Sequence, residues 1–165
     1  MSLLDVILAR RSIRRYEKRE IPEDAMKQII EAGRNAPSAV NRQPIRFIVV
    51  NDVEKKRELS KGMFNRFIKD APVVIVGCAD GNSFLTGKWA VVDAAIAMQS
   101  MVIAAWSLGI GSCWIGDFKE GKVKELLKIP EKWKVVALIT FGFPAEQPKQ
   151  RKKKPAEELF SFNSF

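Results

Sequence analysis

The stretch Pro72-Val73-Val74-Ile75-Val76-Gly77-Cys78-Ala79 is a continuous apolar run with the length of one strand buried on both faces. Residues 47–50 and 112–118 predict two more short strands, the second followed by a turn. Residues 133–143 alternate in hydropathy, which predicts a longer strand with Val135, Ala137, Ile139 and Phe141 on one face. The apolar run is therefore predicted to lie at the centre of a sheet of three or four strands.

Helices are predicted around these strands from their start and stop signals. Ser2 caps a first helix, and Pro22 opens a second helix that has Gly33 near its end. Asp52 caps a third, charged helix, and residues 119–128 form a short last one. Helices thus alternate with strands along the chain.

Residues 88–108 have a helical pattern and are apolar nearly all round. A segment of this length raises the question of a membrane span. Asp93 and Gln99 interrupt it, however, and the sequence contains no second candidate span. The pattern favours a buried core helix and predicts no membrane association.

These elements predict an α/β (α+β) fold, in which a mixed, mainly antiparallel sheet has helices on both faces. Its 165 residues correspond to one domain, residues 1–165, with a C-terminal arm at 149–165. The arm ends in the apolar side chains Leu159, Phe160, Phe162 and Phe165. Because these side chains would form an exposed patch in a monomer, we expect the extended arm to pack on a partner subunit.

The composition narrows the chemistry that the chain can perform. It has no histidine, which removes the commonest general base and the commonest metal ligand. The two cysteines, Cys78 and Cys113, lack metal-site spacing, and no signal peptide precedes Ser2. We therefore expect free thiols, a cytoplasmic location and no metal site. If the chain is an enzyme, a cofactor is expected to carry the chemistry.

The formal net charge of +9 is concentrated at the two ends of the chain. Residues 1–19 have a net charge of +4 and residues 149–165 of +3, which leaves +2 for the long segment between them. A basic nucleic-acid-binding domain is one interpretation of such an excess. The predicted helices carry no concentrated basic recognition face, which disfavours it.

Arg10, Ser12 and Arg14 alternate along the N-terminal basic run. Planar guanidinium groups and a hydroxyl are the donors that a phosphate binds, and an extended turn could present them to one anion. A solvated basic face is the alternative that composition alone leaves open.

The segment 35–44 is rich in turn residues, and its prolines, Pro37 and Pro44, exclude regular structure. Its short polar side chains Ser38, Asn41 and Gln43 offer both hydrogen-bond donors and acceptors to a bound ligand. A plain structural loop is the alternative.

Four segments in order resemble the FMN-dependent nitroreductase family, and the resemblance runs from about Leu4 to about Leu159. They are Arg-Arg-Ser-Ile-Arg-Arg-Tyr at 10–16, Ala-Pro-Ser-Ala-Val-Asn-Arg-Gln-Pro at 36–44, Leu-Gly-Ile-Gly-Ser-Cys-Trp-Ile-Gly at 108–116, and Arg-Lys-Lys-Lys-Pro at 151–155. The third is glycine-rich, but it follows a helix and lacks the spacing of a dinucleotide fingerprint.

The resemblance implies which residues bind FMN. They are Arg10, Arg11, Ser12 and Arg14 at the phosphate and ring; Pro37, Ser38, Asn41 and Gln43 from the other subunit; Ile115, Gly116 and Asp117 beside the ring; Arg151 and Lys153 at the phosphate; and Asn65 as a further candidate. It also implies a homodimer with FMN at the subunit interface. Many relatives have a glutamate where this chain has Gly116, which places the chain in a different subgroup.

The implied activity is that of an FMN-dependent oxidoreductase. NADH or NADPH would reduce the flavin, and a small acceptor such as a nitroaromatic or quinone would then reoxidise it. No side chain is predicted to act as a catalytic acid or base. A flavin-binding storage or sensor protein without turnover would bind FMN in the same way, so the sequence leaves it as the alternative.

Overall fold

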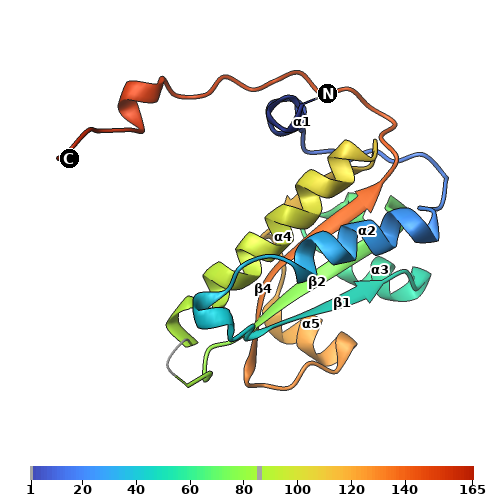
Figure 1. Cartoon of the computed structure of the whole chain (residues 1–165). Coiled ribbons are helices and arrows are strands. Elements are labelled where there is room, and N and C mark those ends of the chain that lie inside the picture. The colour runs from blue at the N-terminus through green and yellow to red at the C-terminus, as the bar shows by residue number, and fades with distance from the viewer. Residues whose placement is uncertain (1, 85–86) are drawn as a thin grey trace.

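The computed structural model describes residues 2–84 and 87–165 and has a four-stranded sheet at its centre (Figure 1). The strands are β1 (Ile45–Val50), β2 (Val73–Asp80), β3 (Gly111–Ile115) and β4 (Trp133–Gly142), in the order β1-β2-β4-β3. All three strand pairs are antiparallel, and a parallel pairing occurs at the isolated bridge between Ser12 and Ser112. The apolar run that includes β2 is central, as predicted.

One face of the sheet is covered by α4 (Ala90–Ser107) and by α2 (Glu23–Arg34), which packs against α4. The core here joins Ile75 of β2 and Ile139 of β4 to Met98 and Val102 of α4. Residues Gly87–Ser107 are long and apolar enough to cross a membrane, but α4 packs against β2, β3 and β4. The prediction of a core helix is confirmed.

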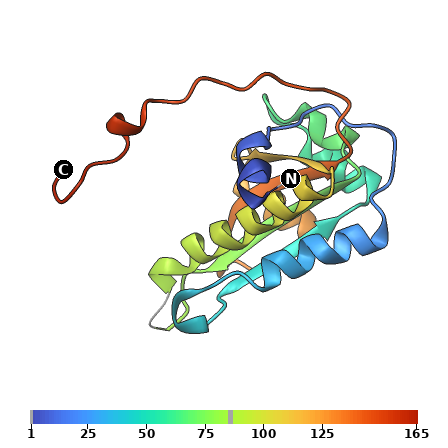
Figure 2. The same ribbon diagram turned by 45° about the horizontal axis from the view of Figure 1, so that its top comes forward.

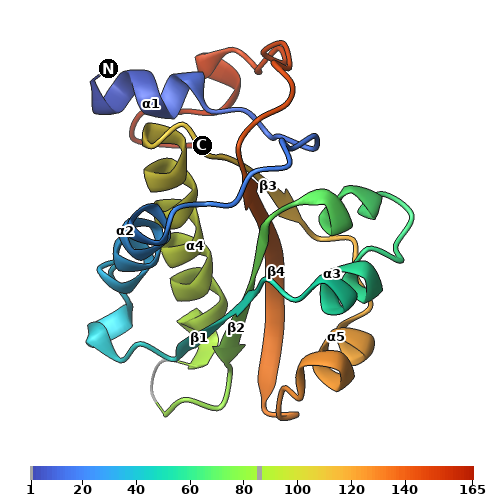
Figure 3. The ribbon, with the colours of Figure 1, turned by 90° about the vertical axis from the view of Figure 1, so that its right-hand side faces the viewer.

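The opposite face is covered by α3 (Val53–Leu59), α5 (Glu120–Leu127) and the 3₁₀ turn η2 (Arg66–Asp70), as Figure 3 shows. Their apolar side chains pack on those residues of β2 that point away from α4, such as Val74 and Val76. Successive residues of a strand point to opposite faces, so a strand covered on both faces is apolar throughout.

The prediction that four side chains of β4 share one face of the sheet is wrong for Val135. Ala137, Ile139 and Phe141 pack toward α4, but Val135 belongs to the core on the other face. The cause is a β-bulge: Gly77 pairs with Ala137, whereas the next residue, Cys78, pairs with Val135. An extra residue in one strand reverses the facing of all residues beyond it.

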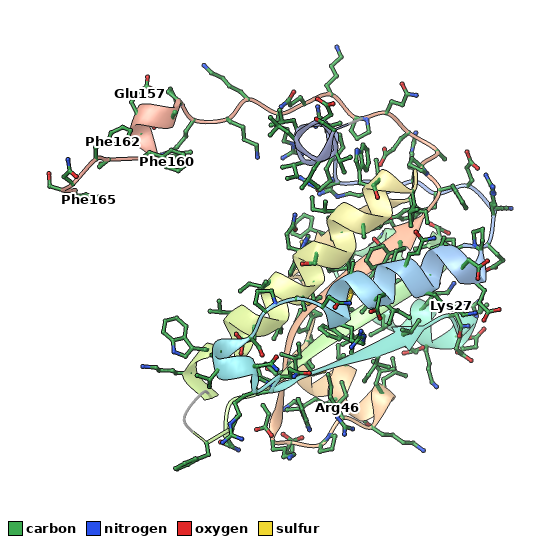
Figure 4. All side chains as sticks on the ribbon, viewed as in Figure 1. Lys27, Arg46, Glu157, Phe160, Phe162 and Phe165 are labelled. Atoms are coloured by element: carbon green, nitrogen blue, oxygen red, sulfur yellow. The ribbon has the colours of Figure 1, made fainter. Side chains whose placement is uncertain are left out.

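The first helix and the start of the C-terminal arm lie at the same end of the fold (Figure 1). Helix α1 (Leu3–Ala9) begins with a capping box, in which the Ser2 hydroxyl accepts from the Asp5 amide and the Asp5 carboxylate accepts from the Ser2 amide. The arm follows β4, contains the short 3₁₀ turn η4 (Ala156–Glu158), and extends away from the sheet (Figures 1 and 2). Its aromatic side chains Phe160, Phe162 and Phe165 are exposed and lie far from the body (Figure 4).

Candidate flavin site

The N-terminal basic run is extended and lies between β3 and the segment that follows β4. The Ile13 amide donates to the Ser112 carbonyl at 2.9 Å, and on the other side the Glu17 amide donates to the Phe143 carbonyl at 2.9 Å. Gly111 allows this approach, because a Cβ there would lie 2.6 Å from the Ile13 side chain. The run is therefore a fixed part of the fold and not a mobile tail.

Buried side chains anchor the same run. Ile13 is 1% exposed, and Tyr16 is buried with its hydroxyl 2.7 Å from Oγ1 of Thr140. The Tyr16 hydroxyl also donates to the Ile13 carbonyl at 2.6 Å. Burial raises the pKa of Tyr16 well above its usual range. With Ile13 and Tyr16 pointing inward, the intervening Arg14 and Arg15 are exposed.

Arg10 and Arg14 provide positive charge beside Ser12. Among the described residues neither guanidinium forms an ion pair. The guanidinium carbon of Arg14 lies 6.0 Å from the centre of the Phe67 ring. Burial raises the pKa of the nearby Cys113 thiol, and Arg14, the Ser12 hydroxyl and Arg10 partly offset that rise. Two arginines without a carboxylate partner next to a hydroxyl form a suitable binding site for an anion.

Arg11 has a different environment. Its Nη1 atom donates to the carbonyl groups of Leu8 and Arg10, both at 2.8 Å. These contacts are at the end of α1, where backbone carbonyl groups lack partners within the helix. They give Arg11 a capping role, while its role at a flavin stays a prediction.

Glu146 was missed by the sequence interpretation, although it lies against the basic run. One of its carboxylate oxygens, Oε1, accepts from the Arg14 amide at 2.5 Å and from the Arg15 amide at 3.1 Å. The Ala145 amide donates to the Arg15 carbonyl at 3.0 Å, which brings Glu146 alongside the run. An acidic residue shortly after Pro144 gives no recognisable signal in the sequence.

The predicted flavin loop, residues 35–44, has an unusual backbone. Val40, Asn41 and Gln43 have φ values of 44°, 55° and 54°. This left-handed conformation costs a residue with a side chain roughly 1–3 kcal/mol, and it is least expected for the β-branched Val40. The Ser38 hydroxyl accepts from the Gln43 amide at 3.0 Å, which closes the loop. Pro37 is exposed at its start.

Asp93 of α4 contacts the middle of this loop. Its Oδ1 atom accepts from the Ala39 amide at 3.1 Å. The Asp93 side chain is buried, and its second oxygen, Oδ2, has no hydrogen-bond partner within the described part of the chain. The sequence indicated Asp93 only as a polar interruption of an apolar helix.

The basic run and the loop lie at opposite ends of α4 (Figure 2). Trp106, near the end of α4, packs on Ile13 and Tyr16, whereas Asp93, near its start, contacts the loop. Thirteen residues of helix correspond to about 20 Å. One chain therefore does not bring the two predicted halves of the site together.

The segment after β3 joins the site through Asn65. The side-chain Nδ2 atom of Asn65 donates to the Asp117 carbonyl at 2.8 Å and to the Leu59 carbonyl at 3.2 Å. An Asp117 carboxylate oxygen accepts from the Phe64 amide at 2.9 Å. Both side chains thus hold backbone in place. Ile115 is buried, while a Cβ at Gly116 would meet no atom within 4 Å, so the space over Gly116 is open.

Arg151 and Lys153 are exposed on the extended part of the arm. Neither forms an ion pair with the rest of the described chain, whereas the neighbouring Lys154 pairs with Glu158 at 3.4 Å. Their contact with a phosphate stays a prediction.

Comparison with known proteins is consistent with this arrangement. A family model described as the nitroreductase family matches residues 7–72 and 59–143. A relative from Methanothermobacter thermautotrophicus is 39% identical over 158 residues, which cover 92% of this chain and 82% of the relative. An FMN reductase [NAD(P)H] of Bacillus subtilis is 32% identical over 173 residues, covering 90% of this chain and 68% of the reductase.

Solved structures share the fold. An FMN-dependent nitroreductase from Clostridium difficile superimposes with a TM-score of 0.85 at 31% identity. The superposition covers 98% of this chain and 99% of the other. The similarity therefore extends beyond the sheet to nearly the whole chain.

Proposed function

The chain belongs to the nitroreductase family, and we propose that it acts as a homodimer with an FMN at each of two sites between the subunits. It is an FMN-dependent oxidoreductase that takes electrons from NADH or NADPH. The acceptor we propose is a small molecule such as a nitroaromatic compound or a quinone. We further propose that residues 1–165 form one domain and that the protein is cytoplasmic, with Cys78 and Cys113 as free thiols.

The main support for the proposed dimer is the distance between the two predicted parts of the flavin site. The basic run and the loop at 35–44 are at opposite ends of α4, about 20 Å apart along the helix. A second copy in the reverse direction would bring its loop to the basic run of the first. Twofold symmetry would then form two equal sites.

Exposed apolar side chains on α1 and the arm support a second copy. The exposed fractions of Leu3, Leu4 and Leu8 are 71%, 62% and 58%, and Phe160 and Phe162 are 69% and 88% exposed. A monomer in water rarely exposes so many large apolar groups in two elements. We propose that the arm packs on the partner subunit.

The donors present suit the phosphate of FMN. We propose that Arg10, Ser12 and Arg14 hold it, with Arg151 and Lys153 reaching it from the arm. Ser38, Asn41 and Gln43 of the partner subunit would offer donors and acceptors to the ring edge. Ile115, Gly116 and Asp117 would lie beside the ring, where the open space over Gly116 permits close approach. FMN, when bound, supplies the hydride chemistry.

The proton is proposed to come from solvent. Tyr16 follows the basic run directly and the Cys113 thiol is influenced by Arg14 and Arg10, and burial raises the pKa of both groups. Neither is therefore suited to donate a proton at neutral pH. The protein's own contribution is to orient the reactants and to stabilise negative charge through Arg14.

The absorbance spectrum of the purified protein tests this proposal. We expect a yellow protein that releases FMN, not FAD, on denaturation and is bleached anaerobically by NADH or NADPH. A colourless protein that takes up no FMN would contradict it. Bound FMN that is not bleached would instead indicate a storage or sensor protein. Analytical ultracentrifugation should show a dimer, and removal of residues 149–165 should weaken it.

A further inference from the structure

The loop at 35–44 holds a conformation that its own sequence disfavours. Its left-handed residues Val40, Asn41 and Gln43 have side chains, and Val40 is 80% exposed, so burial of the Val40 side chain does not stabilise the conformation. The ends of the loop are fixed by neighbouring elements: the Asn35 side chain donates to the Glu31 carbonyl at 2.9 Å, and the Asp80 amide donates to the Pro44 carbonyl at 2.9 Å. The Asn41 amide donates to the Ser38 carbonyl at 2.9 Å and the Gln43 amide to the Ser38 hydroxyl at 3.0 Å, but these contacts lie within the loop and do not anchor its middle to the rest of the fold.

Asp93 supplies that anchor. Its Oδ1 atom accepts from the Ala39 amide at 3.1 Å, directly before the left-handed residues. Asp93 is 3% exposed and belongs to α4, which is packed on the sheet. The contact thus connects the middle of the loop to a helix that is packed on the sheet.

A contribution to folding stability alone does not explain why residue 93 is an aspartate. Its Oδ2 atom is buried and has no partner among residues 2–84 and 87–165. Burying a carboxylate oxygen without a partner disfavours folding, and an apolar side chain of similar size would avoid that cost. A residue that costs stability and holds a strained loop is typical of a functional site.

We propose that Asp93 is a positioning residue for flavin binding, which holds the loop so that Ser38, Asn41 and Gln43 can meet the FMN of the partner subunit. This inference rests on the proposed function, since it assumes that the loop contacts the flavin. Asp93 does not itself touch the flavin in this proposal and acts through the Ala39 amide.

Asp93→Leu is the decisive variant, because it removes the acceptor and the unpaired oxygen while filling the same space. We expect a Tm close to that of the original protein, because loss of the Ala39 hydrogen bond offsets removal of the unpaired oxygen. Hydrogen exchange of the 38–43 amides should be faster in the flavin-free protein, and FMN affinity about tenfold weaker. Asp93→Ala should give the same loss of affinity with a lower Tm. Asp93→Asn keeps an oxygen acceptor and should stay within about threefold of the original affinity.

Val102→Ala is the matched control, since Val102 is a fully buried residue of the same helix that does not contact the loop. It should lower Tm and leave both FMN affinity and loop exchange unchanged. Original affinity and exchange in Asp93→Leu would overturn the proposal, as would an equal loss of affinity in Val102→Ala. If the unmodified protein binds no FMN, the proposed function fails, while loop exchange in Asp93→Leu still decides whether Asp93 holds the loop.

Discussion

The Tyr16 hydroxyl lies 2.7 Å from Oγ1 of Thr140 and 2.6 Å from the carbonyl oxygen of Ile13. Thr140 belongs to β4 and is fully buried, so this pair connects the N-terminal run to the interior of the sheet. The run that presents Arg10, Ser12 and Arg14 is therefore positioned by a buried polar contact and by a backbone pairing. Displacing Tyr16 should affect both stability and flavin binding.

Tyr16→Phe should lower the free energy of unfolding by about 1–3 kcal/mol. The variant keeps the ring but leaves the Ile13 carbonyl without its donor, and the Thr140 hydroxyl keeps only its 3.5 Å contact with the Cys113 carbonyl. Urea unfolding measures the loss, and a double-mutant cycle with Thr140→Val isolates the coupling between the two side chains. A loss below about 0.5 kcal/mol would show that the contact contributes little.

The stability difference between the original protein and Tyr16→Phe should depend on pH. The folded-state pKa of Tyr16 is raised above the usual value of 10.0, so above pH 10 the unfolded chain releases this proton and the folded chain retains it. The contribution of Tyr16 is thus fully present below pH 10 and falls by about 1.4 kcal/mol per pH unit above it. Urea unfolding at pH 8, 10 and 11 checks this, and a constant difference would contradict a buried phenol.

Glu146→Gln should strengthen FMN binding. Glutamine keeps an oxygen that can accept from the Arg14 and Arg15 amides, whereas the negative charge near the proposed phosphate site is lost. Two charges about 4 Å apart in water interact by about 1 kcal/mol, which corresponds to roughly a fivefold change in Kd. Titration at low and high salt measures the gain, which should shrink as salt screens the charge.

Glu146→Ala is the companion variant, since it removes the acceptor as well as the charge. Its affinity should fall below that of Glu146→Gln if the backbone contact positions the run. Equal affinities of the two variants would leave Glu146 with an electrostatic effect alone.

The helices and the central strand could be predicted because the residues that specify them are close together in the sequence. Ser2 and Asp52 cap helices through contacts three residues away, and the apolar run at 72–79 is buried on both faces whatever its neighbours are. Val135 was assigned to the wrong face because the bulge depends on how β4 pairs with β2. No pattern within one strand reports that pairing.

The residues of the candidate site could be predicted from the resemblance to a known family. The chemical properties of the residues alone predicted only part of the site. Pro37 and Pro44 predicted an irregular loop, but the left-handed conformation of Val40 is one that its residue type disfavours. The neighbouring Ala39 amide donates to Asp93, which is 54 residues away in the sequence. Glu146 contacts the Arg14 amide across a separation of 132 residues. Contacts of this range depend on the tertiary fold and leave no mark in either segment.

Gly116→Glu should change flavin chemistry without changing stability. A side chain at Gly116 would enter open space, so the free energy of unfolding should change by less than about 0.5 kcal/mol. The same side chain would stand beside the proposed flavin ring and should alter the rate of flavin reduction by NADH or NADPH in stopped-flow experiments. Gly121→Glu is the control, because Gly121 also faces open space but lies in α5. Unchanged reduction kinetics in Gly116→Glu would remove this segment from the site.

Arg151→Ala should weaken FMN binding about ten- to a hundredfold if the arm reaches the phosphate. A charge-assisted hydrogen bond contributes about 1.5–3 kcal/mol, which gives this range. Lys154→Ala is the control, since it removes the same charge from the same arm but from a side chain that already pairs with Glu158. Fluorescence titration of the flavin-free protein should show a loss for Arg151→Ala that is much larger than for Lys154→Ala. Equal losses would mean that the arm acts only through its net charge, and no loss in either variant would make it a solvated basic tail.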